Sequence, residues 1–135
     1  MDCLSFRNEI SEVSRLEQWL EEALSAAGVN MASVTGINLA LEEIMVNIIN
    51  YAYPGGTQGI GTLDFYKGDG SLVFVFTDSG VPFDPTMTSS PDTSLSAEER
   101  PIGGLGIYLV RQIMDELHYE RTQDGKNVLK LIKKY

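Results

Sequence analysis

Two polar side chains, Glu43 and Asn47, stand four residues apart in an otherwise apolar segment, where their types and spacing could do chemistry together. Residues four apart on an α-helix lie one turn apart on the same side. A carboxylate can accept a proton, and an amide oxygen can ligate a hard cation such as Mg²⁺. The pair is therefore a candidate for metal-assisted or acid–base chemistry. The alternative is a partly solvated helix face with satisfied polar residues.

The segment from Met31 to Ala52 predicts the helix that must carry this pair. On a helical wheel of about 100° per residue, one narrow stripe contains Gly36, Ala40, Glu43, Asn47 and Asn50. Apolar side chains cover the opposite side, and neither Lys nor Arg occurs from Met31 to Tyr53. We therefore expect the polar stripe in the wall of a cleft, with Asn30 as the helix N-cap.

An aspartate follows the most apolar stretch of the chain. Residues Leu72 to Phe76 form a continuous apolar run, which predicts a central strand, and Asp78 and Gly80 come just after it. A carboxylate at the mouth of a buried strand can accept a hydrogen bond from an exocyclic amine such as that of adenine. An ordinary Asp-Ser-Gly turn is the alternative.

Three glycines, Gly103, Gly104 and Gly106, open a helix predicted from about Gly104 to Glu116. Glycines let the backbone approach a ligand closely, and a helix N-terminus presents unpaired N–H groups and a partial positive charge that suit phosphate. The segment matches neither a Walker loop nor a dinucleotide fingerprint. A glycine cluster that only caps the helix is the alternative.

The other segments predict the elements that must position these residues. They are a strand Leu4 to Arg7, a helix Asn8 to Ala27, strands Thr62 to Lys67, His118 to Thr122 and Asn127 to Lys133, and a long loop Pro82 to Pro101. Helices that do not alternate strictly with strands favour an α+β fold. We expect a two-layer sandwich, with a mixed, mainly antiparallel sheet and helices on one face, as a single domain over residues 1–135. For the loop, a functional segment and a disordered insertion are both open.

Charge and composition exclude several classes of protein. The formal net charge of −9 argues against a nucleic-acid partner, because the phosphate backbone repels an acidic chain. A single cysteine favours a reducing compartment, and Cys3 is expected as a buried thiol because its neighbours Leu4 and Phe6 indicate a packed strand. No run approaches the roughly 18 apolar residues of a membrane span. We therefore expect a soluble, cytoplasmic protein without a membrane partner.

In their order along the chain, the three segments described above resemble the motifs of the GHKL ATPase superfamily, also called the Bergerat fold. The pair Glu43/Asn47, the segment Asp78-x-Gly80 and the segment Gly104-x-Gly106 correspond to its N, G1 and G2 boxes. The amino-acid sequences of two boxes narrow the resemblance to the anti-sigma-factor serine/threonine kinases. Their N box is similar to LEEIMVNIINYAY at 41–53, and their G2 box is similar to GGLGIYLV at 103–110.

The resemblance implies ATP and Mg²⁺ as cofactors and assigns roles residue by residue. Glu43 would be the general base, Asn47 the Mg²⁺ ligand and Asp78 the carboxylate that binds adenine. Further nucleotide-binding positions would be Gly80, Arg100, Gly103, Gly104, Gly106 and Asn127. The segment from Asp84 to Arg100 would be the ATP lid. Pro82 departs from the superfamily pattern, since it replaces the second glycine of the G1 box.

The resemblance also implies an enzyme that transfers the γ-phosphoryl group of ATP to a Ser or Thr of an anti-sigma-factor antagonist. A sigma factor and a second copy of the chain are the other partners that it implies. The alternative is a non-catalytic ATP-binding module that sequesters a sigma factor or another regulator. The pair Glu43/Asn47 favours the kinase, and Pro82 leaves room for the alternative.

Overall fold

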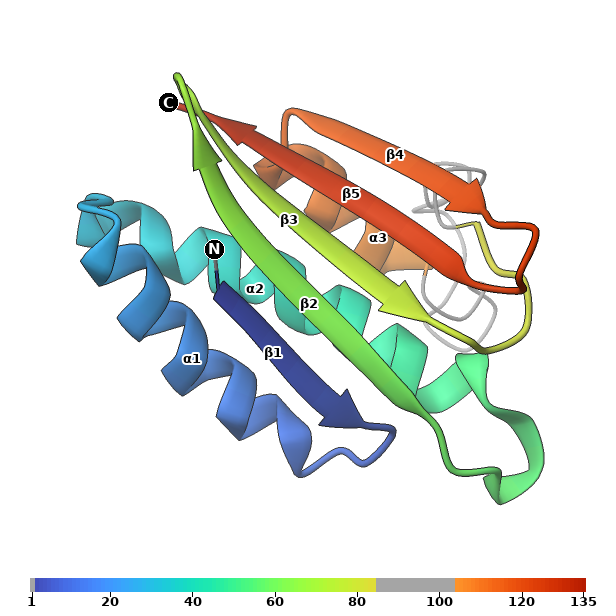
Figure 1. Ribbon diagram of the computed structural model, residues 1–135. Coiled ribbons are helices and arrows are strands. Elements are labelled where there is room, and N and C mark those ends of the chain that lie inside the picture. The colour runs from blue at the N-terminus through green and yellow to red at the C-terminus, as the bar shows by residue number, and fades with distance from the viewer. Residues whose placement is uncertain (1, 85–103) are drawn as a thin grey trace.

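The described residues form one antiparallel sheet that is covered by helices on one face. The computed structural model of the chain describes residues 2–84 and 104–135. Its main elements are β1 (Asp2–Arg7), α1 (Glu12–Ala26), α2 (Met31–Asn47), β2 (Ile60–Gly68), β3 (Ser71–Asp78), α3 (Gly104–Ile113), β4 (Glu116–Arg121) and β5 (Asn127–Lys134). Figure 1 shows the helices together on one side of the sheet. The expected α+β sandwich is confirmed.

The sheet has the strand order β1-β2-β3-β5-β4, so that β3 lies in the middle as its apolar run predicts. Every pairing among the described strands is antiparallel. At one end of the sheet Asp78 of β3 is opposite Asn127 of β5, and Asn127 is opposite Arg121 of β4. Residues that face each other across an antiparallel pair point to the same side of the sheet, so these three side chains share one face.

The core lies between that face of the sheet and the helices. Alternate strand residues such as Phe74, Phe76 and Leu131 are fully buried there, together with Leu16 from α1 and Leu41 from α2. Burying a side chain of this size stabilises the fold by about 1.5–3 kcal/mol. Helix α2 contacts both α1 and α3, so it is the central helix of its layer. This central position carries the polar stripe of α2 to the end of the sheet where Asp78 and Asn127 lie.

Helix α2 does not stop at Asn47 but continues as a π-helical turn, Ile48–Ala52. By length and composition alone, the combined helix Met31–Ala52 could cross a membrane. Its buried residues, among them Ile37, Leu41 and Met45, belong to the core shared with the sheet. Packing against the sheet therefore accounts for the apolar composition that a membrane span would also show.

The first helix is shorter than predicted, because α1 begins at Glu12 rather than near Asn8. The Asn8 side chain instead donates to the carbonyl of Thr57 (2.8 Å) and accepts from the N–H of Gly59 (3.0 Å). Asparagine side chains compete with helical hydrogen bonding in this way. Ile10, which lies within the predicted helix but before the start of α1, is 62% exposed.

Cys3 corrects a second expectation, since its thiol is exposed rather than buried. Leu4 and Phe6 face the core, so Cys3 points to the opposite, helix-free face of β1, where it is opposite Asp64. Partial desolvation raises the pKa of the Cys3 thiol, and the hydrogen bond and negative charge of Asp64 raise it further. A thiol of raised pKa is a poor nucleophile.

Candidate functional site

The site is built around Asp78, the last residue of β3. Its side chain follows the inward alternation of Phe74 and Phe76 and is 5% exposed. Its Oδ1 atom accepts hydrogen bonds from the Gly80 N–H (2.9 Å) and from Nδ2 of Asn127 (3.0 Å). The carboxylate is therefore held at the end of the strand by its own turn and by the neighbouring strand β5.

Gly80 lies directly against the π-helical turn that ends α2. A Cβ at this position would overlap the carbonyl oxygen of Ala52 and lie 2.5 Å from its Cβ. The next residue, Val81, donates its N–H to that same carbonyl at 2.8 Å. Only glycine permits this approach, which joins the loop after Asp78 to the end of α2.

Tyr53 holds the same loop from another side. Its hydroxyl accepts from the Ser79 N–H (3.0 Å) and donates to the carbonyl of Ile60 (3.2 Å). Burial raises the pKa of Tyr53, and the nearby charge of Asp78 also raises it, whereas the hydrogen bond from Ser79 opposes the shift. The phenol thus links the end of the helix to the start of β2 and to the Asp78 turn.

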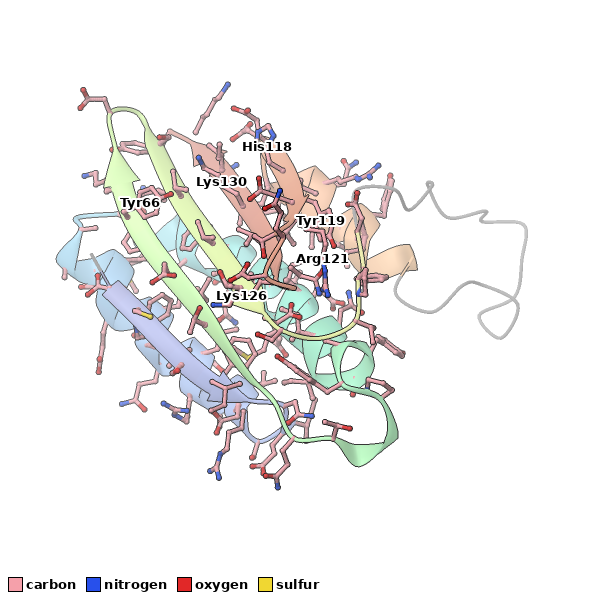
Figure 2. All side chains as sticks on the ribbon, turned by 45° about the vertical axis from the view of Figure 1, so that its right-hand side comes forward. Tyr66, His118, Tyr119, Arg121, Lys126 and Lys130 are labelled. Atoms are coloured by element: carbon pink, nitrogen blue, oxygen red, sulfur yellow. The ribbon has the colours of Figure 1, made fainter. Side chains whose placement is uncertain are left out.

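Two residues of β4 reach the loop from the sheet edge. Arg121 donates from Nη1 to the carbonyl of Gly80 at 2.8 Å, and Tyr119 donates its hydroxyl to Oδ1 of Asn127. Figure 2 shows Tyr119 and Arg121 near each other on this strand. Sequence reasoning missed both residues. The tight turn at Asp124-Gly125 could have indicated them. Counting residues outward from this turn along both strands pairs Tyr119 with Leu129 and Arg121 with Asn127.

A cavity opens between these elements. Three polar residues line it, Asn47, Asp78 and Asn127, and its apolar wall consists of Ile44, Ile48, Ala52, Phe76, Phe83, Tyr119 and Leu129. Its volume is about 30 Å³, which is room for one or two water molecules. A purine base therefore needs part of the wall to move. Phe83, which is 40% exposed, is the least buried aromatic side chain of that wall.

Asn47 brings an unsatisfied donor to this cavity. The residue is 8% exposed, and its Nδ2 atom is buried without a hydrogen-bond partner among the described residues. Leaving such a group unpaired costs about 1–3 kcal/mol. A polar ligand in the cavity would remove that cost by offering an acceptor to Nδ2.

Glu43, one helical turn before Asn47, lies against the start of α3. This helix begins at Gly104. A Cβ on Gly106 would overlap the Glu43 carboxylate and lie 3.2 Å from its Cδ, so the missing side chain leaves room for Glu43. The first turn of a helix is partially positive and attracts anions, whether carboxylate or phosphate.

These contacts follow one another along α2 and its π-helical turn. Glu43 meets α3, Asn47 lines the cavity and Ala52 meets the Asp78 loop. From Glu43 to Ala52 the helix rises by about 13 Å. An extended nucleoside triphosphate spans a comparable distance.

Other expected site residues lie outside the described residues. These are Arg100, Gly103 and the part of the expected lid from 85 to 100. Within residues 2–84 and 104–135, no group of three or more His, Cys, Asp or Glu side chains could hold a metal ion. A cation bound beside Asn47 would have few carboxylate ligands, so amide, backbone, water or ligand oxygens would complete its coordination. Mg²⁺ fits this donor set, because proteins usually bind it through one or two side chains plus substrate phosphates.

Comparison with known proteins gives an independent result. A family model described as "Histidine kinase-like ATPase domain" matches residues 6–133. The serine/threonine-protein kinase BtrW of Bordetella bronchiseptica is 30% identical over 95 residues, which cover 70% of this chain and 66% of that protein. The chain thus spans slightly less than two thirds of this relative. The serine-protein kinase RsbW of Staphylococcus epidermidis is 28% identical, with 90% of this chain and 80% of that protein covered.

Solved structures agree with the fold. A crystal structure of the RsbU and RsbW domains of a Mycobacterium tuberculosis protein superimposes with a TM-score of 0.63 at 13% sequence identity. The match covers 99% of this chain and 32% of that one. At such low identity the likeness concerns the arrangement of helices and strands alone.

Proposed function

Because the chain belongs to the family of histidine kinase-like ATPase domains, we propose that it is an ATP-dependent serine/threonine protein kinase that acts as an anti-sigma factor. Its substrate is an anti-sigma-factor antagonist. The names of the relatives BtrW and RsbW support a protein kinase. The single observation that carries the proposal is the line of contacts along α2, from Glu43 at the start of α3 to the cavity with Asp78.

In this proposal the base of ATP occupies the cavity and the phosphates extend toward α3. The Asp78 carboxylate accepts a hydrogen bond from the exocyclic amine of adenine, and the apolar walls of Ile44 and Leu129 exclude water from the ring. Gly104 opens the helix whose N–H groups bind the phosphates. Arg100 and Gly103, proposed as further contacts, lie outside the described residues.

Asn47 is the residue that would hold Mg²⁺. Its amide oxygen is a suitable ligand, and its unpaired Nδ2 is available to an oxygen of the nucleotide. Mg²⁺ supplies charge neutralisation at the phosphates of ATP. Phosphoryl transfer depends mainly on such positioning and electrostatic stabilisation, so the protein has little covalent chemistry to do.

Glu43 acts as the general base in this scheme. Its carboxylate accepts the proton of the attacking Ser or Thr hydroxyl of the antagonist while Gly106 keeps the space around it open. A positioned base contributes about 10²–10⁴-fold to the rate. The further features of the proposal are a single domain over residues 1–135, a cytoplasmic location, a sigma factor as second partner and a homodimer.

The test is phosphate transfer from radiolabelled ATP to candidate antagonist proteins from the same genome. Transfer to a Ser or Thr of one of them would support the kinase. Binding of ATP without transfer would favour the alternative, a regulatory module that sequesters a sigma factor. Pro82, which replaces the second glycine of the G1 box, is the observation that favours this second function.

Glu43→Gln tests the proposed role of Glu43 as general base in this assay. It keeps the size of the side chain beside Gly106 but removes its basicity. We expect ATP affinity within about twofold of wild type and transfer reduced by about 10²-fold or more. Calorimetric titration gives the affinity, and a single-turnover assay gives the rate. Normal transfer by this variant would remove Glu43 from the mechanism.

A further inference from the structure

The side chain of Asn127 makes four hydrogen bonds to other residues within 2–84 and 104–135. Its Nδ2 donates to Oδ1 of Asp78 (3.0 Å) and to the carbonyl of Val81 (2.8 Å). Its Oδ1 accepts from the Tyr119 hydroxyl and from the N–H of Phe83 (3.4 Å). We call these five residues the Asn127 network.

The partners fix which way the amide points. Reversed, it would place its carbonyl oxygen against the Asp78 carboxylate and its NH₂ group against the N–H of Phe83. Both contacts would be repulsive. The observed orientation pairs each donor with an acceptor, so the network has one arrangement.

The network leaves Asn127 no capacity for a nucleotide. An asparagine amide offers two donors and two acceptor positions, and all of them are used. The sequence resemblance assigns this position to nucleotide binding, but the geometry gives it a different role.

That role follows from the atom of Asp78 that Asn127 contacts. Both hydrogen bonds to the Asp78 carboxylate fall on Oδ1. Among the described residues Oδ2 has no partner, and Asp78 lines the cavity. Occupying Oδ1 fixes the rotation of the carboxylate and leaves Oδ2 for a ligand.

We propose that Asn127, oriented by Tyr119, is a positioning residue that sets the base specificity of the site by directing Oδ2 of Asp78 toward a 6-amino purine. The proposal rests on the proposed function, since it requires the base to occupy this cavity. An exocyclic amine donates to Oδ2, whereas a 6-oxo group presents an acceptor to the same carboxylate. The protein therefore prefers adenine to hypoxanthine nucleotides, and this preference depends on the Asn127 network.

The experiment compares the affinities for ADP and inosine diphosphate, which differ at position 6 of the purine, by calorimetric titration. We expect the wild type to prefer ADP by about tenfold or more, the usual effect of one hydrogen bond to a charged group. Asn127→Ala should bring the ratio below about twofold. Tyr119→Phe, which removes only the hydroxyl, should lower the ratio in the same direction without loss of fold.

Val128→Ala is the matched control, because Val128 is the next residue of β5 and points to the other face of the sheet. The ratio of its affinities for ADP and inosine diphosphate should equal that of the wild type. If Asn127 had only a structural role, its substitution would weaken the binding of ADP and of inosine diphosphate by the same factor. An unchanged ratio of the two affinities in both Asn127→Ala and Tyr119→Phe would overturn this inference and leave the proposed function standing. A wild type that binds neither nucleotide overturns the proposed function and this inference with it.

Discussion

Gly80 and Gly106 each stand where a Cβ would overlap a residue of α2 or of its π-helical turn. At Gly80 the neighbour is the backbone of Ala52, which cannot rotate away. At Gly106 it is the end of the flexible Glu43 side chain. The two glycines therefore differ in what a substitution would disturb: the path of the loop after Asp78 in one case, and the position of the proposed base in the other.

Gly80→Ala should lower the free energy of unfolding by about 1–3 kcal/mol, because the loop must move away from Ala52. Urea denaturation measures the change. Gly36→Ala is the control, since its Cβ would meet only Cγ2 of Ile113 at 3.9 Å and the helix would gain up to about 1 kcal/mol. Equal stability of the two variants would contradict the close packing of Gly80.

Asn47→Ala should separate binding from stability. The substitution removes a buried donor that has no partner among the described residues, so the free energy of unfolding should change by less than about 1 kcal/mol. Nucleotide affinity in the presence of Mg²⁺ should fall by about tenfold or more. Titrations with and without Mg²⁺ test this. Unchanged Mg²⁺-dependent binding would refute the ligand role of Asn47.

The candidate residues were more predictable than their interactions. Residue type and position after an apolar strand identify Asp78, and helical spacing identifies Glu43 and Asn47. The hydrogen bonds of Asn127 and Arg121 depend on which strands are neighbours, and strand order is set by long-range packing that a single sequence does not display. The sequence therefore indicated some residues of the candidate site, but neither Tyr119 and Arg121 nor the connections between β4, β5 and the loop.

At the scale of elements, periodicity predicted the strands and helices well but not all of their ends. The side chain of Asn8 replaces a helical turn with hydrogen bonds to Thr57 and Gly59, partners about fifty residues away. The π-helical turn Ile48–Ala52 has no residue signature that distinguishes it from α-helix. π-turns occur often at functional sites, and this one brings Ala52 to the Asp78 loop.

Tyr53 connects three elements, and its raised pKa gives a pH-dependent test of that connection. A raised pKa in the folded state means that the stabilisation is fully present below about pH 10, the ordinary pKa of tyrosine, and is lost as the pH rises through the folded value. Tyr53→Phe removes the hydroxyl that bonds Ser79 and Ile60 and should cost about 1 kcal/mol at pH 8.

The measurement is the difference in the free energy of unfolding between wild type and Tyr53→Phe from pH 8 to 11. Lysines and other tyrosines titrate equally in both proteins, so the difference isolates Tyr53. We expect the difference to shrink above about pH 10. A difference that stays constant or grows with pH would show that the phenol loses no stabilising interaction when it ionises.

At the scale of the whole molecule, charge opposes the proposed ligand. The net charge is −9, and half of the Lys and Arg residues come after residue 120, mostly along β5. Within the described residues the proposed phosphate site depends on the N-terminus of α3, a dipole that acts within about one helical turn. A negatively charged nucleotide is thus repelled at long range and attracted only at short range.

This arrangement predicts that salt accelerates nucleotide association. The Debye length, the distance over which charges still interact, falls from about 30 Å at 0.01 M salt to about 10 Å at 0.1 M. Added salt therefore weakens the long-range repulsion and leaves short hydrogen bonds to the helix intact. From 0.01 to 0.1 M salt at constant Mg²⁺, we expect the association rate of a fluorescent ADP analogue in stopped flow to rise by about two- to fivefold, with little change in dissociation. Uncharged adenosine is the matched control, and its association should not respond to salt. An association rate that falls as salt rises, as at sites built from Lys and Arg, would mean that cationic side chains rather than the α3 N-terminus attract the phosphates.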